Sequence, residues 1–199
     1  MPSIIGFMLL FNLLQPLESP HLRIDLVFVG SIHPMVEATA MHEVRSIWSP
    51  YNVDIRVTTV DAVPDGAVPR LAVVIASEAD RKLPLATLGA IRFREGVPEP
   101  TILMYANSID ALVAQAPLLR AERQCLPAVH DTMVGRAFGR ALAHEIGHYL
   151  LRSRQHAAGG LMRATHRSPD LIAPERDGFD LAPDEVARIT DVVVTLSHE

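Results

Sequence analysis

One short stretch of the chain carries residue types at the spacing of a metal site. His144, Glu145 and His148 form the pattern HExxH. Residues four apart lie on one face of an α-helix, so both imidazoles can bind one ion. Glu145 lies beside the pair, where its carboxylate can reach a bound water without being a ligand. Zinc lowers the pKa of such a water and polarises a carbonyl while the glutamate carries protons, so the pattern predicts a hydrolytic zinc site.

The segment around these residues predicts a mostly buried helix. It runs without proline from a cap at Asp131 or Thr132 to about Leu151, with apolar residues at three- and four-residue spacing. In a buried helix, two unpaired histidines and a glutamate are costly without a metal. The alternative is a core helix whose histidines are hydrogen-bonded to neighbours, which suits a single histidine better than this set.

Length and composition predict one globular unit. The chain has 199 residues, of which 49% are hydrophobic and 21% charged, and its net charge is −5. Lysine and arginine form no block, which argues against nucleic acid or an anionic membrane as a partner. Cys125 is the single cysteine, so neither an internal disulfide nor a cysteine-based zinc site is expected.

The first residues differ from the rest. Residues 4–14 are nearly all apolar, too few to span a bilayer, and no lysine or arginine precedes them. We therefore divide the chain into an N-terminal segment, 1–20, and a single catalytic domain, 21–199. The segment is either the remnant of an export signal or a short packed helix. The first case predicts a secreted or periplasmic protein, and the second a cytoplasmic one; neither predicts stable membrane insertion.

Hydrophobic periodicity predicts an α/β fold (α+β by some schemes). Strands are expected over residues 22–30, 52–60, 70–76, 88–93 and 101–105, and helices over 34–48, 108–116 and 182–196 in addition to the HExxH helix. The strand at 88–93 is short and carries arginines, which suits a sheet edge. The segment 94–100 is rich in turn residues. Together these elements predict a twisted mixed sheet of about five strands.

The motif and this order of elements resemble the metzincin zinc peptidases, most closely the matrixin-like branch. Gly160-Leu161-Met162 looks like the family's Met-turn, with Met162 in the place of its methionine. Residues 47–53 read like the end of the family's first helix and the start of its second strand, and 179–189 like its closing helix. The resemblance covers most of residues 22–196. It implies a zincin fold, one catalytic zinc ion, and an apolar floor formed by Met162 under the metal.

The chain departs from the family pattern at the third ligand. The family's turn glycine falls on Leu151 and its third histidine on Arg154, whereas the histidine here is His156. To bring His156 back, the helix must end near residues 151–153 through a non-glycine residue. His144, His148 and His156 are the expected zinc ligands. The competing third ligands are His166, Glu175 and Asp177.

These residues predict a zinc-dependent endopeptidase in which Glu145 is the general base. The partner is then a peptide or protein substrate, which the edge strand at 88–93 binds by extending the sheet. The alternative is a non-catalytic, zinc-stabilised peptide-binding module on the same scaffold. A structural zinc has no need of Glu145, which favours the enzyme. A metal-free domain with a coincidental motif is the third reading.

Overall fold

The computed structural model describes residues 20–63, 65–66, 68–79, 87–115 and 126–196. The apolar stretch 4–14 and Cys125 lie outside the described residues. The expectations about an export signal or a short N-terminal helix therefore remain predictions. Among the described residues, no helix combines the length and the apolar character needed to cross a membrane.

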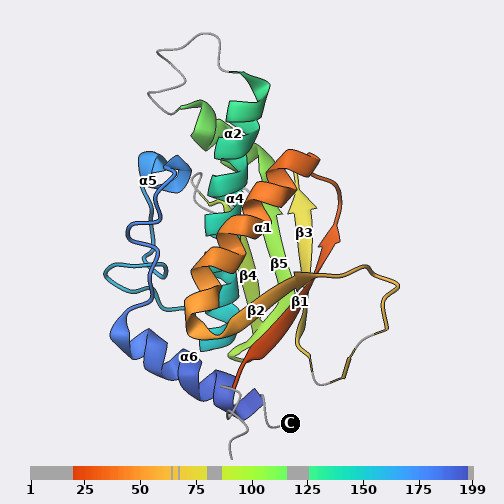
Figure 1. Ribbon diagram of the computed structural model, residues 1–199, viewed down its shortest axis with the longest axis vertical. Coiled ribbons are helices and arrows are strands. Elements are labelled where there is room, and N and C mark those ends of the chain that lie inside the picture. Colours follow the sequence, from red (N-terminus) through yellow and green to blue (C-terminus); the bar gives the residue numbers. More distant parts are fainter. Residues whose placement is uncertain (1–19, 64, 67, 80–86, 116–125, 197–199) are drawn as a thin grey trace, which may run out of the picture.

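A five-stranded mixed sheet forms one layer of the molecule (Figure 1). Its strands are β1 (Leu22–Val29), β2 (Val53–Val57), β3 (Arg70–Ala76), β4 (Gly89–Arg94) and β5 (Val97–Tyr105), in the order β2-β1-β3-β5-β4. Strands β2, β1, β3 and β5 pair in parallel, and β4 is antiparallel to β5. The predicted mixed sheet and the edge position of the strand near 88–93 are confirmed.

The hairpin between β4 and β5 corrects the prediction for residues 94–100. Strand β5 begins at Val97 and contains both prolines of that segment, and only Glu95 and Gly96 form the turn. Their φ angles are 52° and 84°, and two consecutive left-handed residues are typical of the tight turn that joins antiparallel strands. Composition indicated a longer loop because prolines are usually excluded from strands.

The helices pack on one face of the sheet or beside it. They are α1 (Pro34–Trp48), α2 (Ala106–Ala114), α4 (Pro127–Leu151), α5 (Ser168–Ile172) and α6 (Pro183–Leu196), with a short 3₁₀ turn η1 (Ser49–Tyr51) after α1. Figure 1 shows α1 and α4 lying side by side in front of the strands. Helix α4 begins at Pro127, earlier than the predicted cap at Asp131 or Thr132. Proline suits the first turn, and the Thr132 hydroxyl donates to the Ala128 carbonyl at 2.7 Å from inside the helix.

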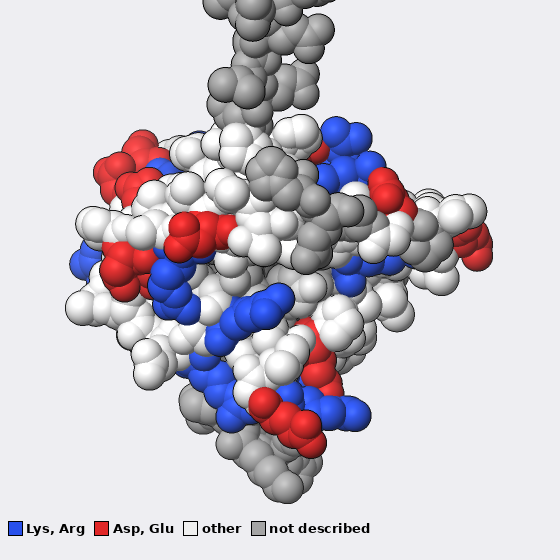
Figure 2. Space-filling model, turned by 90° about the horizontal axis from the view of Figure 1, so that it is seen from below, with Lys and Arg blue, Asp and Glu red and all other residues white. Residues whose placement is uncertain are grey.

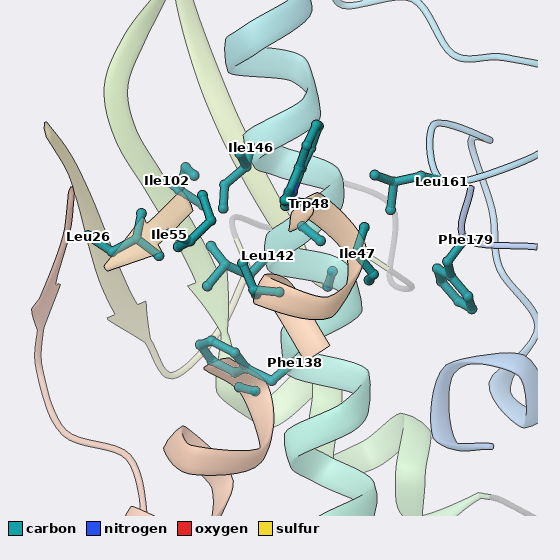
Figure 3. Packing of buried hydrophobic residues seen from close by; sticks show 14 of the residues in the cluster. Leu26, Ile47, Trp48, Ile55, Ile102, Phe138, Leu142, Ile146, Leu161 and Phe179 are labelled. Carbon is teal, nitrogen blue, oxygen red and sulfur yellow. The ribbon is translucent and has the colours of Figure 1, made fainter. Parts of the chain in front are cut away.

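The core lies between α1, α4 and the sheet. In Figure 3, Leu142 and Ile146 of α4 approach Ile55 and Ile102 of the strands, and all four are fully buried. Close packing of α4 on α1 depends on small residues: a Cβ atom on Gly139 would lie 2.5 Å from the carbonyl oxygen of Ala40. This packing fixes the axis of α4 and hence the direction of the side chains near its end.

Candidate metal centre

Helix α4 presents its histidine pair near its C-terminal end. The rings of His144 and His148 lie edge to face with their centroids 4.6 Å apart. His148 and Glu145 are buried and His144 is half-buried. The two imidazoles therefore share one face of the helix, as the four-residue spacing predicts.

The chain reverses direction immediately after α4 ends at Leu151. Arg152 adopts a left-handed backbone, φ 47° and ψ 42°, and its N–H bonds to the carbonyls of His148 and Tyr149. Ser153 then donates its N–H to the His148 carbonyl at 3.3 Å and accepts a bond from His148 Nδ1 at 2.7 Å. A non-glycine residue thus ends the helix, as expected from the missing turn glycine.

This reversal brings His156 to the pair. Its ring stacks on that of His144, with centroids 5.3 Å apart, and lies 4.9 Å from that of His148. One ligand nitrogen from each of these histidines lies within 4.8 Å of the other two. In the described part of the chain this is the one cluster of His, Cys, Asp or Glu that could hold a metal. The Ala157 N–H donates to the Met162 carbonyl at 2.8 Å, which holds the loop closed beside His156.

Hydrogen bonds fix which nitrogen of each helical histidine faces the centre. His144 Nδ1 donates to the Leu161 carbonyl at 2.8 Å, and His148 Nδ1 donates to that of Ser153. Each neutral ring therefore keeps the Nε2 lone pair, the form that binds a metal. Burial, assisted by the neighbouring His148, lowers the pKa of His144 to about 3. Burial also lowers the pKa of His148, so both rings are neutral near pH 7.

His166 helps to orient His144 through a hydrogen bond to a shared carbonyl. Its Nε2 donates to the same Leu161 carbonyl at 3.2 Å, and its Nδ1 accepts a bond from Arg163 at 2.9 Å. Its ring stacks on Phe179 with centroids 4.7 Å apart, and burial lowers its pKa. Both ring nitrogens are thus bonded to protein, so His166 positions the carbonyl that orients His144 and is not free to be a ligand.

A cleft of about 450 Å³ opens above the histidines, between β4 and the segments after α4. Its lining comprises Thr87, Leu88, Gly89, Ala90, Ile91, Phe93, Leu112, Ala141, His144, Glu145, His148, Arg154, His156, Arg163, Ala164, Thr165, His166 and Leu171. Burial raises the pKa of Glu145 to about 7, opposed by a hydrogen bond from the Ile91 backbone. A Cβ atom on Gly89 would lie 3.1 Å from Glu145 Cγ, so the glycine leaves room for the carboxylate.

The predicted Met-turn lies under the helix. Met162 is 1% exposed and packs against Gly147, away from the open cleft. Gly160 has a φ of 74°, and a Cβ atom there would lie 2.3 Å from the Asp180 carbonyl oxygen. The turn therefore needs glycine at this position, and the Leu161 N–H donates to the same oxygen at 2.8 Å.

The structure separates the rival third ligands by position. Glu175 and Asp177 are exposed and belong neither to the cleft lining nor to the histidine cluster. The geometry thus favours His156, whose role as a ligand stays a prediction. The sequence did not predict that the Leu161 carbonyl bonds to His144 or that the Ile91 backbone bonds to Glu145. Every residue carries these main-chain groups, so residue type does not show which of them belong to a site.

Comparison with known proteins identifies the fold. No family model and no curated protein matches the sequence. Among solved structures, the chain is similar to the crystal structure of archaemetzincin from Methanopyrus kandleri, with a TM-score of 0.53 and 14% sequence identity. The match covers 91% of this chain and 99% of that chain. This likeness concerns the metzincin-like fold, and the matrixin-like branch stays a prediction. The chain therefore has a zincin-like fold similar to that of archaemetzincin.

Proposed function

We propose that this chain is a zinc-dependent endopeptidase. The observation that carries the proposal is the convergence of three imidazole nitrogens within 4.8 Å of one another, directly below an open cleft that also contains Glu145. Zinc takes imidazole nitrogens at about 2.0–2.1 Å, so small ring movements suffice for His144, His148 and His156 to bind one ion. The archaemetzincin-like fold supports the same reading.

In the proposed hydrolysis, the zinc ion, Glu145 and the Ile91 backbone have separate roles. A bound zinc ion supplies Lewis acidity and lowers the pKa of water. Glu145 takes a proton from the attacking water and passes it to the amide nitrogen as that nitrogen leaves. The backbone bond from Ile91 fixes the carboxylate against the edge strand, where an extended substrate adds to the sheet.

The apolar part of the cleft lining determines where a substrate side chain binds. Leu112, Ala141 and Leu171 come from three different helices and line the cleft on the side toward the start of α4. They form a hollow suited to an apolar side chain next to the scissile bond. The peptide is the substrate class that a sheet edge beside a hydrolytic centre fits best.

The test is hydrolysis of a mixed quenched-fluorescent peptide library by the zinc-loaded chain. Glu145→Gln should keep its zinc and fold but cleave about 10²–10⁴-fold more slowly, as expected for loss of a general base. Glu175→Gln is the matched control, because that glutamate is exposed and outside the cleft. Equal cleavage by Glu145→Gln and the parent would exclude this role for Glu145. A zinc-loaded parent that cleaves no peptide would instead indicate the non-catalytic peptide-binding module.

A further inference from the structure

Arg154 is held in a defined position although its side chain is exposed. Its guanidinium donates to the Phe93 carbonyl at 3.1 Å, and its Cζ lies 4.9 Å from the centre of the Phe93 ring. Both contacts join the segment after α4 to the end of β4 at the mouth of the cleft. A guanidinium stacked and bonded in this way loses little further freedom on binding a carboxylate.

Among the described residues of the cleft, Arg154 is the cation whose guanidinium is left to face a ligand. The charged residues that the described part of the chain contributes to the lining are Glu145, Arg154 and Arg163. Arg163 is occupied, since it donates to His166 at 2.9 Å and to the Asp170 carboxylate at 2.8 Å. Arg154 has five N–H donors, and the Phe93 carbonyl is the acceptor found for it among the described residues.

The contacts of β4 with Glu145 and with Arg154 define how far Arg154 lies along the strand from Glu145. The Ile91 backbone bonds to Glu145, and the carbonyl of Phe93, two residues further along the strand, bonds to Arg154. Two residues of a strand span about 6.6 Å. A peptide that adds antiparallel to β4, the more stable pairing, runs from the Phe93 end toward the Ile91 end. Residues before its scissile bond therefore pass Arg154.

We propose that Arg154 selects peptides with an acidic side chain about two residues before the scissile bond. The proposal rests on the proposed peptidase function and adds the class of substrate. Figure 2 shows basic and acidic side chains interspersed on the end of the molecule where α6 lies. No single-sign field spreads over that face. The competing role is a purely structural tie between β4 and the loop, which predicts no preference for charge.

The experiment compares peptides that differ by one side chain. Peptides cleaved from the library are resynthesised with Glu or Gln about two residues before the cleaved bond, and in a second pair about two residues after it. For the zinc-loaded parent, kcat/KM should be roughly 2- to 5-fold higher with Glu before the bond, and nearly equal for the second pair. The preference should shrink between about 0.05 M and about 0.5 M salt.

Variants separate recognition from structure. Arg154→Gln should bring the Glu/Gln ratio to about one, and Arg154→Glu should favour a Lys peptide over a Glu peptide. Arg94→Gln is the control, because Arg94 lies at the same strand end but is 82% exposed and paired with Glu99 at 3.0 Å. It should keep the parent's ratio. Zinc content is measured for every variant. If both Arg154 variants lose zinc, the parent's ratio of kcat/KM for the Glu and Gln peptides, and the salt dependence of that ratio, decide whether Arg154 recognises the substrate.

Two outcomes have distinct meanings. Equal kcat/KM for the Glu and Gln peptides, or a preference that survives in Arg154→Gln, overturns the role of Arg154 and leaves the peptidase intact. A zinc-loaded parent that cleaves none of the library overturns the peptidase function itself.

Discussion

The sulfur of Met162 lies where a side chain on Gly147 would begin: a Cβ atom on Gly147 would be 2.3 Å from it. The glycine is part of HExxH, so the motif provides the space that Met162 fills under the histidine cluster. This contact joins the HExxH motif to the Gly160-Leu161-Met162 turn, two parts of the sequence that each carry the resemblance to metzincins.

The contact predicts a larger loss of stability for a change at Gly147 than for one at Met162. Gly147→Ala should destabilise the fold by up to about 2 kcal/mol, because the new methyl group overlaps the sulfur and the buried Met162 side chain must move, which outweighs the gain of about 1 kcal/mol that alanine brings to a helix interior. Met162→Leu is close in volume and should cost less than about 1.5 kcal/mol and keep zinc bound. Urea unfolding and metal content measure both. A Gly147→Ala protein as stable as the parent, or loss of metal in Met162→Leu, contradicts this packing.

A buried ion pair holds the segment that follows the Met-turn. Arg140 and Glu43 are 3.0 Å apart, and their side chains are 0% and 3% exposed. Arg140 also donates to the carbonyls of Asp170, Ala173 and Glu175. Arg140→Met should therefore cost about 2–3 kcal/mol in the free energy of unfolding, since it leaves several carbonyls without this donor, while Glu43 keeps its bonds from Arg176 at 3.1 and 3.2 Å.

The control for that change is Arg136→Met, one helical turn earlier. Arg136 donates to the Ile172 carbonyl at 3.1 Å, so its loss should cost no more than about 1.5 kcal/mol. Similar costs for the two variants in chemical denaturation would show that the buried pair is not what holds the segment.

The helix end at Arg152 offers a stabilising substitution. A non-glycine residue with a φ of 47° carries strain that glycine does not. Arg152→Gly should raise the free energy of unfolding by up to about 1 kcal/mol, and Arg152→Val should lower it. Thermal melting of the two variants checks the order, and a more stable valine variant would contradict the left-handed end.

The carboxylate of Asp170 makes the free energy of unfolding depend on pH in the acid range. Bonds from Arg167, then from Arg163, hold its pKa down to about 2. A lowered folded-state pKa stabilises the fold fully above the unfolded value of about 3.9, and the contribution is lost as the pH falls through about 2. Asp170→Asn should thus be less stable than the parent at pH 6, with the difference shrinking toward pH 3. A difference that is constant across this range in urea titrations contradicts the assignment.

The elements with strong local patterns were predictable from the sequence. Helix α1 and strand β3 have the predicted bounds, because their apolar periods are long and their ends carry proline or polar residues. The start of α4 was placed too late, since Asp131 and Thr132 look like caps although Pro127 opens the helix. The hairpin at Glu95 and Gly96 was missed for a similar reason, because nearby prolines suggested a loop.

The candidate site was predictable where side chains define it. The spacing of His144 and His148 fixed their shared face, whereas the return of His156 depends on the backbone of Arg152. Neither the shared Leu161 carbonyl nor the contact of Arg154 with Phe93 has a local signature in the sequence. These contacts depend on segments brought together only by the tertiary fold.

The most direct test of the central claim is the zinc affinity of histidine variants, measured by competition with a chromogenic chelator at one pH. The parent should bind one zinc ion, and His156→Ala should lower the affinity about as much as His148→Ala does. Glu175→Ala should bind like the parent, as should His33→Ala, whose side chain is 64% exposed and outside the cluster. Parent-like zinc binding by His156→Ala, together with loss of zinc in Glu175→Ala or His166→Ala, would contradict the three-histidine site.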